Sequence, residues 1–290
     1  MKGYTNAHGA VTPMEKVLVN VTSDNGVLPN GFIITITDNK GTVLATTGES
    51  SYSISIPYDT EYIVSASSVD GYITPANQTF TASQPLRNVN VGYKCKPIGV
   101  CIVDADGDLV DVDSWTGGSN ATGVYVSDGV RFLIIAPKRQ EYKWGGYGKL
   151  LSNIFTTSKG TTAITDFAGS SNTDQIISQL KGVTVSYKHF YTGESGTITG
   201  APAAEYCRAY SNGCKKAGEW YLPSAGEMNL LMINKNAINS ALAKISGQSL
   251  SLEWTSTQYN EDRAWYNSWD GDDYEYFKYD DYYVRPVCSL

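Results

Sequence analysis

The first third of the chain alternates apolar and polar residues with a period of two. Lys16–Thr22 reads K-V-L-V-N-V-T, Gly31–Thr37 reads G-F-I-I-T-I-T and Ser51–Ile56 reads S-Y-S-I-S-I. The alternation returns in Glu61–Ser65 and Arg87–Val91, and turn residues separate these runs. Because β-branched residues dominate and no helical period appears, the pattern predicts a series of short strands.

About seven such strands in about eighty residues predict an all-β immunoglobulin-like sandwich over residues 15–95, preceded by an N-terminal arm over residues 1–14. The pattern becomes mixed beyond Cys95-Lys96-Pro97, so a second domain is expected over residues 96–290. We predict that this second domain is α+β.

The second domain opens with strands. Ile98–Val103 and Leu109–Val112 flank the turn D-A-D-G-D, and Gly123–Val126 and Val130–Ile135 flank S-D-G, which is a hairpin signal. The sequence therefore predicts two successive hairpins here.

Helix signals follow. Asp174–Leu180 and Ala201–Tyr210 predict short helices. The clearest helix begins at Ser224, which forms a capping box with Glu227. Apolar residues then continue at broadly helical spacing, and Gly247 is the expected terminator. We therefore predict one long helix from Ser224 to Gly247.

Composition and charge exclude some partners. The 290 residues carry a net charge of −7, so a nucleic-acid backbone is not expected as a partner. No run approaches the roughly 18 apolar residues of a membrane-spanning helix, so no membrane insertion is predicted. The N-terminus lacks the apolar core of a secretory signal, so the chain either does not use that export route or has lost a leader.

The cysteines and histidines offer little chemistry. The five cysteines are predicted to be buried thiols, with a Cys95–Cys101 or Cys207–Cys214 disulfide as the alternative in an oxidising medium. His189 is expected to be structural, since no nucleophile motif accompanies it. We therefore predict no enzymatic activity.

The Asp-rich turn at Asp104–Asp108 suggests a calcium loop. Its Gly107 precedes the third Asp, and no Glu closes the loop at the twelfth position, so a hairpin turn is favoured. The sequence predicts neither a metal site nor a cofactor.

The segment Trp254–Tyr283 changes the picture. It holds seven of the chain's 21 tyrosines and three of its six tryptophans, with six Asp and two Glu against one Lys and one Arg. Tyrosine beside Asn and Asp is typical of binding surfaces, because it offers a large rigid contact area at low entropic cost. The codons of Tyr, Asn and Asp differ only at the first base, which suggests diversification at adenines.

Four motifs give this composition a context. W-T-S-T-Q at Trp254–Gln258, A-W at Ala264-Trp265 and Y-V-R-P-V at Tyr283–Val287 follow W-Y-L-P-S at Trp220–Ser224, with Glu227 beyond it. Together they resemble the variable proteins of diversity-generating retroelements. The resemblance implies a C-type-lectin-like fold over residues 96–290, with residues 254–283 as a hypervariable ligand-binding segment.

The resemblance also divides this segment. It implies that Trp254, Trp265, Phe277 and Arg285 are scaffold. The predicted ligand-binding positions, all Tyr, Asn or Asp, are Tyr259, Asn260, Asp262, Tyr266, Asn267, Asp270, Asp272, Asp273, Tyr274, Tyr276, Asp280 and Asp281.

Such proteins commonly lie at phage tail tips or on bacterial surfaces. The leading hypothesis is a non-enzymatic receptor-binding protein of a phage tail, located on the virion. Its expected partners are a host cell-surface protein or glycan and, through the N-terminal domain, other tail proteins, with a homotrimer as one assembly that tail proteins adopt. The alternative is an exported pilus-tip or surface adhesin of the same fold. A further alternative is a hydrolase or an enzyme resembling the formylglycine-generating enzymes, although the cysteine pair of the latter is not found.

Overall fold

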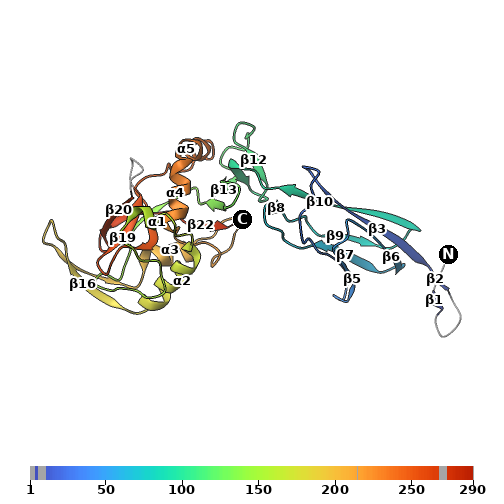
Figure 1. The fold of residues 1–290 in the computed structure, drawn as a ribbon, viewed down its shortest axis with the longest axis horizontal. Coiled ribbons are helices and arrows are strands. Elements are labelled where there is room, and N and C mark those ends of the chain that lie inside the picture. Colours follow the sequence, from blue (N-terminus) through green and yellow to red (C-terminus); the bar gives the residue numbers. More distant parts are fainter. Residues whose placement is uncertain (1–3, 6–10, 214, 268–272, 290) are drawn as a thin grey trace. The chain divides into compact units, whose positions relative to one another are not determined.

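The protein is represented by a computed structural model, which describes residues 4–5, 11–213, 215–267 and 273–289. The chain divides into two compact units, Met1–Lys96 and Pro97–Leu290. The division lies one residue beyond the end of the predicted sandwich. We call these the N-terminal unit and the C-terminal unit (Figure 1).

The N-terminal unit is a sandwich of two four-stranded sheets. One sheet has the order β6-β3-β10-β8 and the other has the order β5-β4-β7-β9. The strands are β3 (Met14–Ser23), β4 (Ile34–Asp38), β5 (Val43–Thr47), β6 (Ser51–Pro57), β7 (Glu61–Ala66), β8 (Tyr72–Ile73), β9 (Gln78–Thr81) and β10 (Leu86–Cys95). The predicted strand runs are confirmed, although the second begins at Ile34 rather than at Gly31. Two short strands, β1 (Tyr4–Thr5) and β2 (Val11–Thr12), pair ahead of the sandwich.

One hydrophobic core joins the two sheets. Val17 and Val19 of β3 pack with Ile34 and Ile36 of β4, and all four are nearly inaccessible to solvent. Such burial follows from the period of two, which places alternate residues on one face of a sheet. All pairings are antiparallel except that of β3 with β10, which is parallel.

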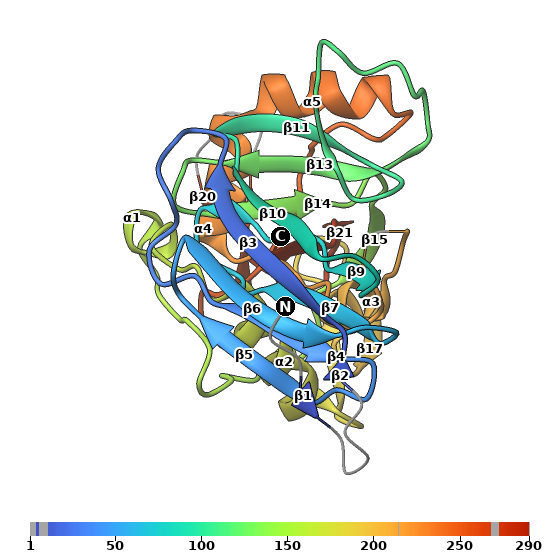
Figure 2. The ribbon, with the colours of Figure 1, turned by 90° about the vertical axis from the view of Figure 1, so that its right-hand side faces the viewer.

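A five-stranded antiparallel sheet with the order β12-β11-β13-β14-β22 forms the base of the C-terminal unit. Its strands are β11 (Gly99–Asp104), β12 (Leu109–Asp111), β13 (Ala121–Ser127), β14 (Phe132–Ile135) and β22 (Val287–Ser289). Both predicted hairpins are present, β11–β12 and β13–β14. Figure 2 shows β11, β13 and β14 side by side with α5 next to them.

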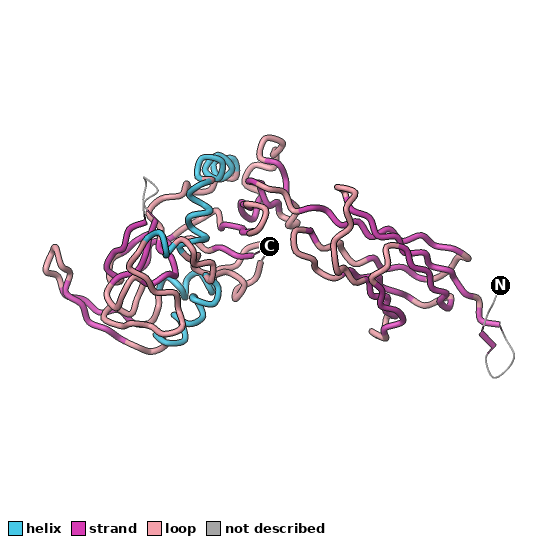
Figure 3. Tube along the Cα trace, viewed as in Figure 1, coloured by secondary structure: helices cyan, strands magenta, loops and turns pink. Residues whose placement is uncertain are grey.

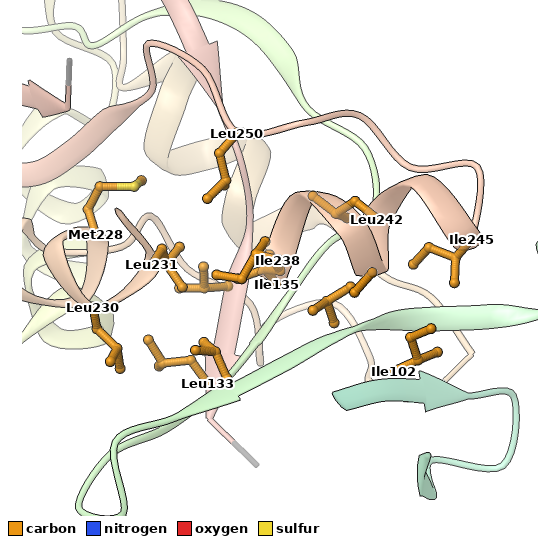
Figure 4. Packing of buried hydrophobic residues seen from close by; sticks show 14 of the residues in the cluster. Ile102, Leu133, Ile135, Met228, Leu230, Leu231, Ile238, Leu242, Ile245 and Leu250 are labelled. Carbon is orange, nitrogen blue, oxygen red and sulfur yellow. The ribbon is translucent and has the colours of Figure 1, made fainter. Parts of the chain in front are cut away.

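Two helices cover one face of this sheet. Leu231 of α4 (Ala225–Ile233) and Ile238 and Leu242 of α5 (Lys235–Lys244) pack against Ile102 and Ile135 of the strands (Figure 4). Alternate strand residues, such as Tyr125 and Ile134, pack with Trp220 on the opposite face. Among the described residues, helices occur only in the C-terminal unit (Figure 3).

The prediction of one helix from Ser224 to Gly247 is wrong, because Asn234 separates two helices. Its backbone leaves the helical region at φ −98° and ψ 12°, and its Nδ2 donates to the carbonyl oxygen of Leu230. Asn makes such local bonds readily and therefore favours helix ends. The left-handed residue after α5 is Ser246 at φ 56°, not Gly247, whose N–H donates to Leu242.

A second group of elements lies between β14 and β22. It comprises β15 (Gln140–Lys143), α1 (Gly160–Ala163), α2 (Gly169–Leu180), β16 (Thr184–Lys188), β17 (Ser195–Thr199), α3 (Pro202–Ala209), β18 (Trp254–Gln258), β19 (Arg263–Asn267), β20 (Asp273–Phe277) and β21 (Asp281–Val284). Strand β15 pairs with β21, β16 with β17, and β18, β19 and β20 form a three-stranded sheet. The core of this second group of elements contains Trp144, Trp254 and Leu222, which pack with residues of α2 and α3.

The second helix begins earlier than predicted, at Gly169 rather than Asp174. Its first turn is polar, so no apolar period announces it. Asn172 and Thr173 are nevertheless buried and hydrogen-bonded. A Cβ on Gly169 would lie 2.1 Å from Oε2 of Glu227, so the close approach of α2 to α4 requires glycine.

Across the described residues, no helix has both the length and the apolar character needed to cross a bilayer. The chain is rich in strands and has few helices. The described helices lie together with strands in the C-terminal unit, in agreement with the α+β prediction for that unit. The C-type-lectin-like assignment of that unit stays a prediction.

Candidate ligand-binding face

Strand β18, which holds the W-T-S-T-Q motif, is buried along its whole length. The Nε1–H of Trp254 donates to the carbonyl oxygen of Tyr142 (3.1 Å), and Oγ1 of Thr255 donates to the carbonyl oxygen of Trp265 (2.8 Å). Oγ1 of Thr257 donates to Oδ2 of Asp166 (2.6 Å). Buried polar groups need partners, and here each motif side chain joins β18 to another element.

Asp166 connects β18 to α2 and α4. Its Oδ2 also accepts from Nδ2 of Asn172 (2.8 Å), and its carbonyl oxygen accepts from Oγ of Ser224 (2.7 Å). Ser224 forms the predicted capping box with Glu227. Glu227 also accepts from the hydroxyl of Tyr221 (3.0 Å), and burial raises the pKa of the Glu227 carboxyl. The W-Y-L-P-S motif and its Glu therefore belong to the same buried network.

Arg285 of the Y-V-R-P-V motif is fully buried. Its Nε donates to Oε1 of Glu253 (3.0 Å), which is also fully buried, and its Nη atoms donate to four backbone carbonyls, including those of Ala136 and Gln248. This arginine fixes the turn that leads from β21 to β22. The predicted scaffold positions Trp254, Trp265 and Arg285 are accordingly inaccessible.

Lys278 is a buried cation that follows β20 directly. Its Nζ donates to Oε1 of Gln258 (2.8 Å) and to the carbonyl oxygens of Lys149 (2.9 Å) and Glu261 (3.0 Å). Burial lowers the pKa of Lys278 to about 7, while the Asp262 and Glu261 carboxylates act in the opposite direction. The ammonium thus fastens the end of β20 to β18.

Above this scaffold lies a cluster that we call the tyrosine face: Tyr266, Tyr274, Tyr276 and Tyr282. The ring of Tyr266 stacks on Tyr282 with centroids 4.7 Å apart and lies 6.3 Å from Tyr274 and 6.2 Å from Tyr276. Tyr274 is 40% exposed and the other three are partly buried. Burial is the largest cause of the raised pKa of Tyr276 and of Tyr282. The hydroxyls of Tyr276 and Tyr282 therefore stay protonated and can both donate and accept hydrogen bonds.

The remaining predicted positions divide by their contacts. Tyr259 packs edge-on against Trp265, with centroids 5.3 Å apart. Oδ1 of Asn260 accepts from the backbone N–H groups of Asp262 and Arg263, so it shapes the β18–β19 turn. Asp262 itself is partly exposed.

Asn267 requires a correction, because its side chain is only 4% exposed. Its Oδ1 accepts from the N–H of Glu253 (2.6 Å), and its Nδ2 donates to the carbonyl oxygen of Ser251 (2.6 Å). The amide ties β19 to the segment before β18. It belongs to the scaffold and does not reach a ligand at the surface.

Two Asp positions mark the start of β21: Asp280 precedes the strand and Asp281 is its first residue. Asp281 is exposed and pairs with Lys143 of β15. Asp280 is partly buried, its Oδ1 lies 2.9 Å from Nε2 of His189, and burial is the largest cause of its raised pKa. Asp270 and Asp272 lie outside the described residues, and Asp273 belongs to β20, of which only the backbone is described there.

The hairpin formed by β16 and β17 reaches the same region and was not predicted. The hydroxyl of Tyr279 accepts from the N–H of Phe190 (3.0 Å) at the hairpin tip. Tyr279 also stacks on Tyr187 and on Phe277, with centroids 4.8 and 4.9 Å apart. The available sequence signal was the short alternation T-V-S-Y-K at Thr184–Lys188, followed by S-G-T-I-T at Ser195–Thr199.

The other candidates for chemistry have local structural roles. Oδ1 of Asp104 accepts from the N–H groups of Asp106 and Asp108, as in the favoured hairpin turn. Among the described residues, no three His, Cys, Asp or Glu side chains gather as metal ligands would. Cys95 and Cys101 are free thiols, so the Cys95–Cys101 disulfide is not formed. Cys207 is a free, buried thiol, and Cys214 lies outside the described residues.

Comparisons with known proteins find only distant likenesses. No protein-family model and no curated protein matches the chain. A fimbrial protein from Bacteroides ovatus is 12% identical with a TM-score of 0.46, covering 96% of this chain and 71% of its own. Shaft pilin SpaA from Lactobacillus rhamnosus GG is 15% identical with a TM-score of 0.25 and covers 32% and 53%. The pilus adhesin RrgA from Streptococcus pneumoniae is 9% identical with a TM-score of 0.20 and covers 79% and 36%. At these TM-scores the likenesses carry no argument about function.

Proposed function

We propose that the protein is a non-enzymatic adhesin of a bacterial surface or pilus tip, and that the tyrosine face binds its ligand. The observation that carries the proposal is the contrast within one sheet: exposed or half-exposed tyrosines on β19 and β20 stand beside β18, which is wholly buried. A rigid support lowers the entropy that the contact residues lose on binding. Tyrosines held in this way are the residues that contribute most to protein recognition.

The same arrangement supports the proposal that the chain is a variable protein of a diversity-generating retroelement with a C-type-lectin-like C-terminal unit. The motif residues that carry the resemblance lie in the buried networks around Asp166 and Arg285. The positions between the motifs include the tyrosine face. Such a division lets the surface change while the support stays constant.

The second candidate function is the same ligand binding by a receptor-binding protein of a phage tail. Both placements expose the tyrosine face to another cell, so they differ in the genes around this one and not in the chemistry of the face. The DNA separates them. An export signal upstream and pilus genes nearby support the adhesin, whereas tail genes support the phage.

The retroelement proposal has its own test in the DNA. It requires a near-identical template repeat beside a reverse-transcriptase gene, with differences from codons 254–283 confined to adenines of the template. A neighbourhood without such a repeat contradicts the retroelement origin but leaves binding by the face untouched.

The binding proposal is tested by the triple variant Tyr266→Ala/Tyr274→Ala/Tyr276→Ala. We expect binding of the purified, fluorescently labelled protein to a panel of intact bacterial and animal cells to fall at least tenfold, measured by flow cytometry. Phe167→Ala is the control, since Phe167 is also an exposed aromatic of the C-terminal unit but packs against Arg131 and belongs to neither β19 nor β20. A triple variant that stays folded and binds as the parent does contradicts the proposal.

A further inference from the structure

We propose that the tip of the β16–β17 hairpin, residues His189–Glu194, forms a second part of the ligand-binding face, and that it receives a positively charged segment of a protein ligand. The proposal rests on the proposed function and adds to it a contact surface outside Trp254–Tyr283 and a class of partner. Figure 1 shows this hairpin, labelled at β16, projecting from the rest of the C-terminal unit.

The tip exposes two large aromatic side chains in succession. Phe190 is 73% exposed and Tyr191 is 68% exposed, the highest values of any aromatic residue among the exposed large hydrophobic side chains described. Leaving both rings in water forgoes the burial free energy of two aromatic side chains. Adjacent exposed aromatics on a soluble protein are typical of an interaction site.

The tip is nevertheless held in one shape. Nδ1 of His189 accepts from the N–H groups of Tyr191 and Thr192, both at 3.2 Å. The backbone N–H of His189 donates to the carbonyl oxygen of Glu194 across the turn (2.7 Å), and the backbone N–H of Gly193 donates to the carbonyl oxygen of His189 (2.9 Å). The hydrogen bonds close the loop on itself, so little conformational entropy remains to be lost on binding.

Further contacts dock the tip onto the C-terminal segment. His189 reaches Asp280, and Phe190 lies over Phe277 with ring centroids 6.0 Å apart. The Phe277 ring in turn lies 6.1 Å from the ring of Tyr276, a member of the tyrosine face. The hairpin tip therefore adjoins the tyrosine face through Phe277.

Ring geometry favours a protein over a sugar. The Phe190 and Tyr191 rings are nearly perpendicular, at 89°, so they offer no common plane on which one pyranose ring could lie. One face of Phe190 is already occupied by Phe277. Two rings that project at right angles fit a contoured surface, as anchor residues of protein interfaces do.

Charge favours a basic segment. Glu194 at the tip and Asp281 are exposed carboxylates, and Asp280 and Glu275 are partly exposed. Lys143 pairs with Asp281 and Arg263 pairs with Glu275 (3.0 Å), so among the described ion pairs Glu194 and the His189-bound Asp280 are the carboxylates of these four that no Lys or Arg pairs with. Lys188, whose side chain runs past Gly193, is an exposed cation in the same hairpin. Arginine suits such a site, because its guanidinium stacks on aromatic rings and bonds to carboxylates.

The experiment uses the full chain and a random linear peptide library. Peptides are selected on the immobilised parent protein, synthesised, and titrated against Phe190→Ala/Tyr191→Ala by calorimetry. The matched control is Val130→Ala/Ile233→Ala, which removes two apolar side chains of similar exposure elsewhere on the same unit. Circular dichroism and the thermal midpoint verify that each variant is folded.

We expect the selected peptides to be enriched in Arg and Lys and to bind the hairpin variant roughly thirtyfold more weakly, while the control binds as the parent does. Peptides without basic enrichment, no selectable peptide, or full affinity for the hairpin variant would overturn the proposal. Binding to a neutral glycan array that depends on Phe190 and Tyr191 would overturn the partner class.

The triple tyrosine variant separates this proposal from the proposed function. If it loses the peptides and the hairpin variant keeps them, the adhesin proposal stands and the hairpin proposal fails. If neither variant changes binding, both fail.

Discussion

Strands β18 and β20 flank the same central strand and have opposite roles. Every residue of β18 is buried, and its hydroxyl and amide side chains are used to hold α2, α4 and the loop before α1. Strand β20 lies at the edge of the sheet and carries the exposed Tyr274 and the partly buried Tyr276. The comparison teaches that the motif on which the resemblance rests is buried and lies apart from the surface proposed to bind a ligand. Each prediction below tests that separation, beginning with the largest expected change.

The largest expected effect is on the buried support of β18. Arg285→Ala removes the fully buried partner of Glu253 and leaves only Arg139, 3.7 Å from the carboxylate, so the free energy of unfolding should fall by about 3–5 kcal/mol in urea denaturation. Arg263→Ala is the control on the exposed side, where loss of the half-exposed pair with Glu275 should cost less than about 1 kcal/mol. Similar losses for the two variants would erase the distinction between the strands.

Lys278, between the two strands, predicts a pH dependence. Its pKa is about 7 in the folded chain and close to the ordinary lysine value of 10.5 when unfolded, so the unfolded state binds more protons between these values. Stability should therefore rise as pH increases from about 7 toward 10, by up to a few kcal/mol. Below about pH 7 both states are protonated and this residue adds no slope.

The check is to compare thermal unfolding of the parent and of Lys278→Met across that range. Methionine has no charge to titrate and keeps much of the chain length, so the difference in stability between the two proteins should change with pH. A constant difference would show that Lys278 keeps an ordinary pKa, with its three carbonyl oxygen ligands compensating for burial.

Asn267 sharpens the comparison at the central strand. Asn267→Ala removes two short hydrogen bonds to residues 251 and 253, so we expect a loss of about 1–3 kcal/mol in stability with no direct effect on ligand contacts. Measuring both stability and cell binding separates the two roles. A folded, fully stable Asn267→Ala protein with weakened binding would return this residue to the ligand-binding set.

The smallest expected change is at the edge. Tyr274→Ala removes a side chain that is 40% exposed, so unfolding stability should stay within about 0.5 kcal/mol of the parent. Chemical denaturation measures this directly. A loss of several kcal/mol would mean that β20 is part of the core and not a surface on which residues can be exchanged.

The sequence predicted what local chemistry determines. The period of two in Lys16–Thr22 gave β3, and Ser224 with Glu227 gave the start of α4. The same local reasoning failed where a distant partner decides. Asn267 is a polar residue of a type that usually lies at the surface. Its burial depends on hydrogen bonds with the backbone of Glu253 and Ser251, which the local sequence does not indicate.

Two more elements escaped prediction. The first turn of α2 is polar because its Asn172 and Thr173 satisfy buried groups of other segments, so no apolar stripe marks it. The β16–β17 hairpin has a short alternating pattern, T-V-S-Y-K and S-G-T-I-T, which the prediction missed, and the position of its tip depends on Tyr279 and Asp280, about ninety residues further along the chain.

The position of β22 determines which changes in the segment Trp254–Tyr283 still allow the base sheet to form. This strand and Arg285 lie downstream of Trp254–Tyr283 in translation, yet β22 pairs with β14 and Arg285 bonds to the carbonyl of Ala136. A frameshift or premature stop inside the segment therefore removes the strand that completes the base sheet. Substitutions at the exposed positions of the segment leave β22 and Arg285 in the chain, whereas errors that change the reading frame remove both and with them the last strand of the base sheet.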